Sequence, residues 1–232
     1  MHFARIAIAV ALAGALPLAA CGASNDDRTP PSVLAGDSTP VPASGDTVLE
    51  RRADHARIQG AASAPLWIVE VSDFQCPYCR TWHEETYHTI VKEYVETGKV
   101  RLAYINFPLS GHKNAWPAAE AAMCAAAQDK FWPVHDGLFN EQEKWGGLPD
   151  PTALFDSIAT RAGVDLSTYR DCISKHEMRA LIQGDIDRAT ESGVNATPSF
   201  IIGSTMISGA QPAAAFREII AKELRAKQGD EK

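Results

Sequence analysis

Apolar and polar positions along this chain predict a strand, a helix, a second strand, a long helical region, a hairpin and a closing helix. Residues 66–71 are almost all apolar and predict a buried strand. Apolar residues then recur at helical spacing over 78–98, and residues 100–107 predict a second strand that ends at Pro108. The same patterns predict helices over 116–128, 131–139, 151–162, 165–173, 175–192 and 212–227, and hairpin strands over 199–202 and 205–208.

The first strand-to-helix junction carries two cysteines in a CxxC arrangement, Cys76 and Cys79. Pro77 falls at the first helical position, where its missing N–H is no loss and its fixed φ suits the turn. Cys76 is therefore expected at or beside the N-cap, where unpaired N–H groups and the helix dipole lower the pKa of a thiol below about 8.5. Cys79 is expected one turn deeper on the same helix face, within reach of a mixed disulfide on Cys76. This placement indicates thiol–disulfide exchange, with Cys76 as the nucleophile and Cys79 as the resolving thiol.

A CxxC can also supply half of a zinc site. A structural zinc needs four ligands, and the sequence has no second CxxC and no closely spaced histidine pair, although the fold could recruit His83 and His112. We therefore predict no metal. His83 and Asp73 are weaker candidates for tuning the thiol, and His83 is expected at the surface.

The N-terminus predicts export. A short basic start is followed by an apolar run over 6–20 that is too short to span a bilayer, which is typical of a signal peptide over 1–20. Residues 18–21 resemble the lipobox of bacterial lipoproteins, which implies cleavage before Cys21 and attachment of lipid to it. The alternative is an ordinary secretory signal followed by an incidental cysteine.

Residues 21–48 are rich in Pro, Ser, Thr, Gly, Ala and Asp and contain few large apolar side chains, so they predict a flexible linker. The remainder, 49–232, has the length and apolar content of one domain. The formal net charge of -7 argues against a basic groove for nucleic acid. No second apolar stretch is long enough to cross a membrane, so lipid on Cys21 would be the anchor.

The sequence contains five cysteines, and assigning Cys21 to lipid leaves an even set of four. The short spacing of Cys76 and Cys79 selects the pairing that also joins Cys124 to Cys172. This second bond would be structural, would close a loop of about 49 residues, and would stabilise the fold by roughly 4 kcal/mol on the chain-entropy model. The alternative is two buried free thiols, which exported proteins seldom keep.

Three segments together resemble the DsbA-type family of thiol–disulfide oxidoreductases, and the resemblance extends over about 54–227. They are residues 73–79, the pair 131–132 with the alanine-rich helix before it, and residues 196–200. The resemblance implies an α/β protein, namely a thioredoxin fold with an inserted helical subdomain over about 112–192. The predicted order of strands and helices agrees with that architecture.

The resemblance also implies roles for residues outside the CxxC. Pro198 matches the cis-proline of the family, which packs against the active-site disulfide, and the backbone of Thr197 would pair with substrate peptide. An ordinary trans proline that begins a strand is the alternative. Glu70 matches a carboxylate that exchanges a proton with the buried cysteine, here Cys79. Burial in an apolar strand would raise the pKa of Glu70, whereas a solvated edge-strand acid would have no such role.

The resemblance favours net oxidation. The expected substrates are exported proteins with thiols or disulfides, contacted by Thr197, Pro77 and Tyr78, and no cofactor is expected. A membrane quinone-linked oxidase is the implied redox partner, and the periplasm or cell envelope is the implied location. Reduction potentials in this superfamily span roughly -270 to -120 mV, and the two residues between the cysteines do not fix the value. A disulfide reductase or isomerase therefore stays open, as does a non-catalytic metal- or peptide-binding module.

Overall fold

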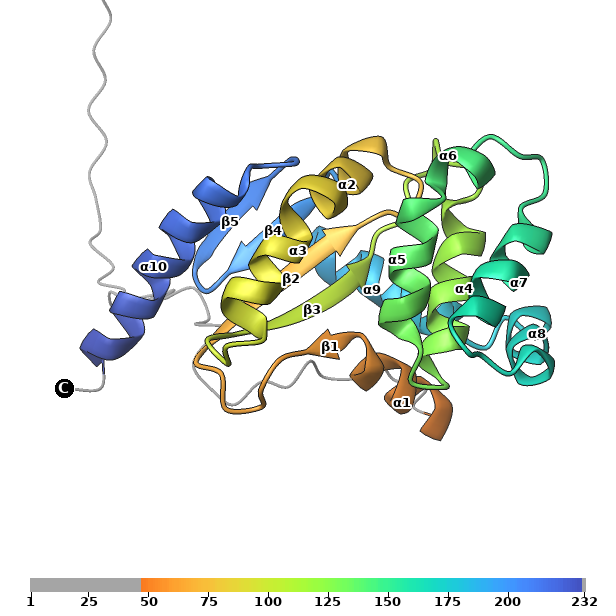
Figure 1. Cartoon of the computed structure of the whole chain (residues 1–232), viewed down its shortest axis with the longest axis horizontal. Coiled ribbons are helices and arrows are strands. Elements are labelled where there is room, and N and C mark those ends of the chain that lie inside the picture. The colour runs from red at the N-terminus through yellow and green to blue at the C-terminus, as the bar shows by residue number, and fades with distance from the viewer. Residues whose placement is uncertain (1–46, 231–232) are drawn as a thin grey trace, which may run out of the picture. The chain divides into compact units, whose positions relative to one another are not determined.

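The computed structural model describes residues 47–230, which combine one sheet with helices (Figure 1). The strands are β1 (Ile58–Gln59), β2 (Leu66–Ser72), β3 (Val100–Asn106), β4 (Ser199–Ile202) and β5 (Thr205–Ser208). The helices are α1 (Val48–Ala56), α2 (Pro77–Trp82), α3 (His88–Ile90), α4 (Ala115–Ala126), α5 (Phe131–Asn140), α6 (Gln142–Trp145), α7 (Thr152–Arg161), α8 (Leu166–Ser174), α9 (Arg179–Glu191) and α10 (Ala213–Asp230), with π-helical turns η1 (His83–Tyr87) and η2 (Val91–Val95).

Some of the expectations from the sequence concern residues that the structure does not describe. The predicted signal peptide over 1–20, the lipidated Cys21 and nearly all of the predicted linker lie outside the described residues. Among the helices that are described, none combines the length and the apolar character needed to span a membrane.

β2 lies at the centre of a five-stranded sheet with the strand order β1-β3-β2-β4-β5. It runs parallel to β3 and antiparallel to β4, and β1 and β5 pair antiparallel at the two edges. A parallel pair needs a long crossover connection, which the helical run from α2 to η2 provides. The sheet confirms the predicted α/β class, and β2 to β5 match the predicted strands to within one residue at each end.

Helices cover both faces of the sheet (Figure 1). The run from α2 to η2 and the long helix α10 lie on one face, and α9 lies on the other. The core on the first face contains Leu66 and Ile68 of β2 together with Trp82 of α2 and Phe216 of α10. Because β2 is covered on both sides, a polar side chain in this strand cannot reach bulk water without a partner or a path.

The predicted helix over 78–98 is helical from Pro77 to Val95, but it is not a uniform α-helix. The π-helical turns η1 and η2 interrupt it, and π turns in proteins occur often at functional sites. The first of them starts at His83, one turn after the CxxC, and turns His83 and Tyr87 into the core.

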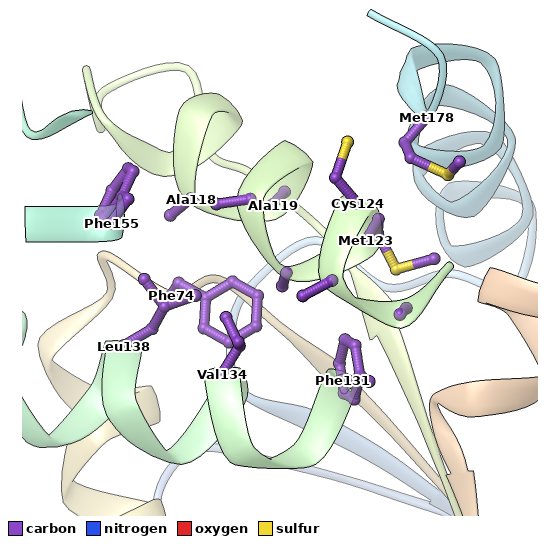
Figure 2. Close-up of a cluster of buried hydrophobic side chains, with 14 of the residues drawn as sticks. Phe74, Ala118, Ala119, Met123, Cys124, Phe131, Val134, Leu138, Phe155 and Met178 are labelled. Atoms are coloured by element: carbon purple, nitrogen blue, oxygen red, sulfur yellow. The ribbon is translucent and has the colours of Figure 1, made fainter. Parts of the chain in front are cut away.

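The chain between β3 and β4 forms the helices α4 to α9. Almost every side chain of α4 is buried, and most of them are alanine, so that other helices can approach it closely from several sides. Figure 2 shows Phe131, Val134 and Leu138 of α5 pointing toward α4, with Phe74 from the CxxC loop among them. This shared core fixes the helical region against the loop that carries the cysteines.

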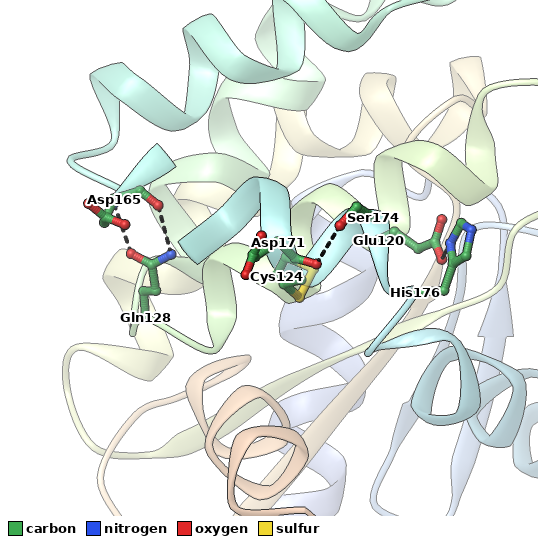
Figure 3. The surroundings of a disulfide bond; sticks show 8 residues. Glu120, Cys124, Gln128, Asp165, Asp171, Ser174 and His176 are labelled. Carbon is green, nitrogen blue, oxygen red and sulfur yellow. Dashed lines mark hydrogen bonds and ion pairs between the residues drawn. A yellow bond between two sulfur atoms is a disulfide. The ribbon is translucent and has the colours of Figure 1, made fainter. Parts of the chain in front are cut away.

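A disulfide joins Cys124 of α4 to Cys172 of α8, 48 residues apart in sequence (Figure 3). Near it, Gln128 exchanges two hydrogen bonds with the backbone of Asp165, at 3.1 and 2.8 Å. The disulfide attaches the last turn of α8 to α4, and the Gln128 hydrogen bonds attach the start of α8 to the turn that follows α4. The pairing of Cys124 with Cys172 is therefore present in the structure, and neither thiol is free.

The predicted helix over 175–192 begins later than expected, at Arg179. His176 adopts a left-handed φ of 53°, which no regular helix accommodates, so α8 and α9 are separate. The ring of His176 is held in this turn by Glu120, whose Oε1 lies 2.8 Å from Nδ1 (Figure 3). The sequence around His176 could not reveal this contact, because Glu120 lies 56 residues away in the chain.

Residues 48–59 form α1 and β1, which the sequence pattern did not predict, and α6 was also missed. α1 begins with a capping box in which Thr47 Oγ1 accepts from the N–H of Glu50 at 3.1 Å and Glu50 accepts from the N–H of Thr47 at 2.8 Å. At its other end Arg57 is buried between Asp54 and Asp185. The domain therefore starts with a docked helix at the position where the linker was expected to end.

Candidate active site

Cys76 is the N-cap of α2, and Pro77 is the first residue of that helix. Both cysteines of the CxxC are free thiols in the structure. Cys76 keeps 4% of its surface exposed, whereas Cys79 has none, so that only Cys76 can be reached by another protein. Tyr78, between them, is 68% exposed and extends from the same turn into solvent.

The pKa values of the two thiols are shifted in opposite directions. A hydrogen bond with the Cys79 thiol is the largest cause that lowers the pKa of Cys76 to about 6, and the N–H groups of Cys79 and Tyr78 act in the same direction. Burial, followed by the neighbouring Cys76 sulfur, raises the pKa of Cys79 well above its usual value. At neutral pH, Cys76 is therefore mostly a thiolate and Cys79 a thiol, as a nucleophile and a resolving cysteine require.

The loop before β4 lies against Cys76. Its Thr197–Pro198 peptide bond is cis. The Sγ of Cys76 lies 3.5 Å from the carbonyl oxygen of Thr197, a residue 121 positions later in the chain. The carbonyl oxygen of Pro198 accepts a hydrogen bond of 2.7 Å from the N–H of Gly209, which ties the loop to the end of β5. The fold thus brings Thr197 and Pro198 to the exposed sulfur.

Glu70 occupies the central strand β2 and is completely buried. Neither of its carboxylate oxygens has a hydrogen-bond partner of ordinary geometry among the described residues. Burial raises the pKa of Glu70 to about 8, and the nearby Ser72 hydroxyl offsets only part of this rise. This environment excludes the interpretation of Glu70 as a solvated edge-strand acid. It favours a carboxyl group that gains or loses a proton near neutral pH.

Polar side chains of the helical region hold the loop that carries the cysteines. The side-chain amide of Gln142 donates to the carbonyl oxygens of Phe74, at 2.6 Å, and of Cys76, at 3.0 Å. Gln75 accepts a hydrogen bond of 2.7 Å from the N–H of Asn114. The sequence did not identify Gln142 or Asn114 as site residues, because their contacts join segments that only the folded chain brings together.

Asp73 has a structural role next to the CxxC. Its buried carboxylate accepts hydrogen bonds from the N–H groups of Gln75, at 2.7 Å, and Leu109, at 3.0 Å. The Nδ1 of His112 lies 2.6 Å from the same carboxylate. Asp73 therefore connects the loop after β2 with the loop after β3, and His112 faces Asp73.

The expectation that His83 lies at the surface is wrong, because its side chain is 1% exposed. The helical region covers it: its Nε2 lies 3.0 Å from Asp136 Oδ1, and the Nδ1 of His135 lies 3.0 Å from the same oxygen. Within the described residues, these three side chains are a group close enough together to hold a metal ion.

The other ring nitrogens of this cluster argue against a metal. His83 Nδ1 and His135 Nε2 are buried and have no hydrogen-bond partner in the described part of the chain. A histidine that binds a metal normally donates its second N–H to an acceptor, and neither ring does so here. Burial also lowers the pKa of His135 to about 4, so its ring is neutral. Hydrogen bonds to Asp136 account for the cluster, and no cysteine belongs to it.

Comparison with known proteins finds sequence relatives over this region. The profile of the family described as Thioredoxin matches residues 52–222. The "Probable disulfide bond formation protein D" of Bacillus anthracis is 30% identical over 152 residues, which cover 63% of this chain and 69% of that protein.

Solved structures show the same arrangement of the backbone. The crystal structure of oxidised BdbD from Bacillus subtilis has a TM-score of 0.68 and 24% identity, and the match covers 73% of this chain and 92% of that chain. The crystal structure of alpha-DsbA1 from Wolbachia pipientis has a TM-score of 0.67 and 23% identity, covering 76% and 94%. At such identities the two structures establish a shared fold.

Proposed function

This chain belongs to the DsbA-type branch of the thioredoxin family and is a protein thiol–disulfide oxidoreductase, and from that premise we propose that it forms disulfides in exported proteins through Cys76 and Cys79. The proposal rests on the opposite ionisation of two cysteines within one helical turn. Cys76 at the N-cap has a pKa lowered to about 6, while Cys79 is buried and protonated.

The proposed reaction starts from a Cys76–Cys79 disulfide. A client thiolate attacks Cys76 Sγ, the bond to Cys79 breaks, and the departing Cys79 thiolate takes up a proton. A second client thiolate then attacks the client sulfur of the mixed disulfide, which forms the client disulfide and releases Cys76 as a thiolate. Two electrons pass from the client to the enzyme. One of the two client protons ends on Cys79 and the other is released to water.

The residues around the sulfur have distinct proposed roles. The backbone of Thr197, next to Pro198, would pair with the client peptide, since its carbonyl oxygen lies 3.5 Å from Cys76 Sγ. Pro77 and the exposed Tyr78 would form the rest of the contact surface. Glu70 would donate a proton to Cys79 or accept one from it, because a carboxyl group with a pKa of about 8 can do either near neutral pH.

The low pKa of Cys76 supports oxidation as the net direction. A stabilised Cys76 thiolate favours the reduced form of the pair, and an enzyme whose reduced form is stabilised has a strongly oxidising disulfide. Continued turnover then requires an acceptor for the two electrons. We propose a membrane quinone-linked oxidase as this partner, which the family resemblance implies.

The proposed location is the periplasm or another part of the cell envelope. The signal peptide over 1–20 would direct export, and lipid on Cys21 would hold the protein at a membrane. A linker of about 27 residues has a typical reach on the order of 30 Å, so the catalytic domain could meet clients away from the lipid surface.

A refolding assay with cysteine variants tests the proposed chemistry. The oxidised protein should introduce disulfides into a reduced, unfolded client, and Cys76→Ser should abolish this activity. Cys79→Ser, with Cys76 first charged as a mixed disulfide with glutathione, should exchange glutathione for a client thiol and accumulate a client mixed disulfide, visible on a non-reducing gel. Retention of oxidase activity by Cys76→Ser would exclude the proposal. A non-catalytic module would show no turnover, and its Cys76→Ser variant would lose bound zinc instead.

Thiol trapping in cells tests the direction. An oxidase should hold the Cys76–Cys79 pair mostly as a disulfide, because its redox partner keeps regenerating that form. A pair found mostly reduced would assign the protein to disulfide reduction or isomerisation.

A further inference from the structure

One face of the sheet changes from apolar to polar toward the CxxC. Successive side chains of a strand alternate between faces, so Leu66, Ile68, Glu70 and Ser72 of β2 share one face. The first two belong to the apolar core under α2, and the last two are polar. On the neighbouring strand, Tyr104 stands directly opposite Glu70 in the parallel register. A polar patch of Glu70, Ser72 and Tyr104 therefore lies where β2 ends and the CxxC loop begins.

The side chains of this patch are fully desolvated without being paired. Glu70 and Tyr104 have no exposed surface, and Ser72 has 1%. Both carboxylate oxygens of Glu70, the Oγ of Ser72 and the hydroxyl of Tyr104 make no hydrogen bond of ordinary geometry with the described residues. An unpaired buried polar group destabilises a fold by about 1–3 kcal/mol. The stability of the fold therefore does not explain why three such side chains lie together.

Ser72 is the common neighbour of the groups involved. The Ser72 hydroxyl offsets part of the rise in the pKa of Glu70, of Cys79 and of Tyr104, although it makes no hydrogen bond of ordinary geometry with any of them. The Ser72 side chain thus lies within reach of both the buried carboxyl group and the buried thiol. A hydroxyl group can accept one proton while it donates another.

We propose that Ser72 is the proton relay between Cys79 and Glu70, an inference that rests on the proposed function of the cysteine pair. When a mixed disulfide on Cys76 is resolved, Cys79 Sγ passes its proton to Ser72 Oγ, and Ser72 passes its own hydroxyl proton to a carboxylate oxygen of Glu70. The Cys79 thiolate attacks Cys76 Sγ, the bond from Cys76 to the client sulfur breaks, and the client leaves as a thiolate that is protonated by water. In the oxidising direction the same protons move in reverse.

Two tyrosines near the relay stay protonated near neutral pH. Tyr104 is kept protonated because burial, with the charges of Glu70 and Cys79, raises its pKa well above the usual value. Burial likewise raises the pKa of Tyr87 in η1, and Glu70 adds to that rise. The charged or titratable side chains around the patch are Cys76 at the N-cap of α2, Cys79 from α2, Tyr87 from η1, Tyr104 from β3 and Asp73 from the CxxC loop.

The relay predicts a substitution that harms catalysis but not the fold. Ser72→Ala removes a hydroxyl that has no ordinary hydrogen bond, so the free energy of unfolding should stay equal or increase. The reduced protein is mixed with oxidised glutathione, and the reaction is stopped with acid and followed by mass spectrometry from pH 5 to 9. The first step, attack by Cys76, should keep its wild-type rate. The second step, attack by Cys79, should slow at least tenfold at pH 7, so that the glutathione mixed disulfide accumulates.

Three further variants separate a relay from a structural effect. Ser72→Thr retains a hydroxyl and should restore most of the second-step rate. Glu70→Gln should slow the same step, and Ser72→Ala with Glu70→Gln should be no slower than the slower single variant, because both interrupt one path. Tyr169→Phe removes another buried, unpaired hydroxyl, in α8 of the helical region, and should leave both steps unchanged.

Two results would overturn the relay while leaving the proposed function intact. They are a wild-type second step in Ser72→Ala, and effects of Ser72→Ala and Glu70→Gln that multiply in the double variant. Failure of the proposed function itself looks different, since the wild-type protein would then form no mixed disulfide in the first step.

Discussion

The proposed chemistry of Cys76 and Cys79 follows from their positions at the start of one helix. Cys76 and Pro77 could be placed from the sequence because an N-cap and the residue after it are neighbours in the chain. The burial of His83 could not be predicted in this way, because Asp136 and other residues of α5 cover His83 and lie far from it in the sequence. Ser72 and Gln142 were missed for the same reason.

The lowered pKa of Cys76 predicts how its reactivity depends on pH. The thiolate fraction, and with it the rate of alkylation by iodoacetamide, should rise with pH around a midpoint near 6, where an ordinary cysteine has a midpoint near 8.5. In the Cys79→Ala variant the midpoint should increase, because the hydrogen bond with Cys79 is the largest cause of the lowered value. A wild-type midpoint of 8 or above would contradict this electrostatic account.

The raised pKa of Glu70 predicts a pH dependence of stability. The folded chain keeps the Glu70 proton up to about pH 8, whereas the unfolded chain loses it near pH 4.5. This contribution to the free energy of unfolding is therefore complete below about pH 4.5 and is lost as the pH rises to about 8. Between pH 5 and pH 8, the free energy of unfolding of the wild type should therefore fall by roughly 2–4 kcal/mol more than that of Glu70→Gln.

Urea unfolding of both reduced proteins at the two pH values measures that difference. The opposite contribution of Cys76, whose pKa is lowered, is common to both proteins and cancels. An unchanged pH dependence in Glu70→Gln would show that Glu70 titrates normally in the folded protein.

At the scale of elements, strands were predicted more accurately than helix ends. The hairpin strands β4 and β5 were correct because alternation and the turn at Gly203 are local signals, and Gly203 indeed has a left-handed φ of 56°. The start of α9 was not predicted, because a distant contact of His176 determines it. α1 was missed although its capping box, Thr47 with Glu50, is a local signal. Periodicity identifies which residues can form a helix, and packing determines where the helix starts.

The disulfide between α4 and α8 predicts a change in stability without a change in chemistry. Replacing both Cys124 and Cys172 by alanine opens a loop of 48 residues and should lower the free energy of unfolding by about 2–4 kcal/mol. The rate of thiol exchange at Cys76 should stay within twofold of the wild type at 25 °C. Denaturant unfolding and the glutathione reaction measure the two quantities. A stability loss below 0.5 kcal/mol would mean that the helical region is held by its alanine core alone.

At the scale of the whole described domain, one buried carboxylate connects three distant segments. Asp185 of α9 binds the guanidinium of Arg57 after α1, and it accepts hydrogen bonds from the backbone and side-chain N–H groups of Asn106 in β3, at 3.1 and 3.0 Å. Asp185→Ala leaves Arg57 buried with less compensation, so the free energy of unfolding should fall by about 3–5 kcal/mol.

A matched control comes from α1 itself. Arg52 pairs with Asp129, but their side chains are 54% and 62% exposed, so Arg52→Ala should change the free energy of unfolding by less than about 1 kcal/mol. Equal losses in Arg52→Ala and Asp185→Ala would contradict the distinction between a buried and a solvated ion pair. Neither variant alters a residue of the active site.

The proposed attachment of the chain to a membrane yields a prediction at the scale of the intact protein. If Cys21 is lipidated, the mature protein should begin at Cys21, carry the mass of its acyl groups, and partition into detergent. Cys21→Ala should shift the protein out of the detergent phase, while the purified variant oxidises a soluble client at the wild-type rate, because Cys76 and its surroundings lie within residues 47–230. Mass spectrometry of the N-terminus and detergent partitioning measure these properties. An unmodified Cys21 in the mature protein would refute lipid attachment and leave the chemistry of the domain untouched.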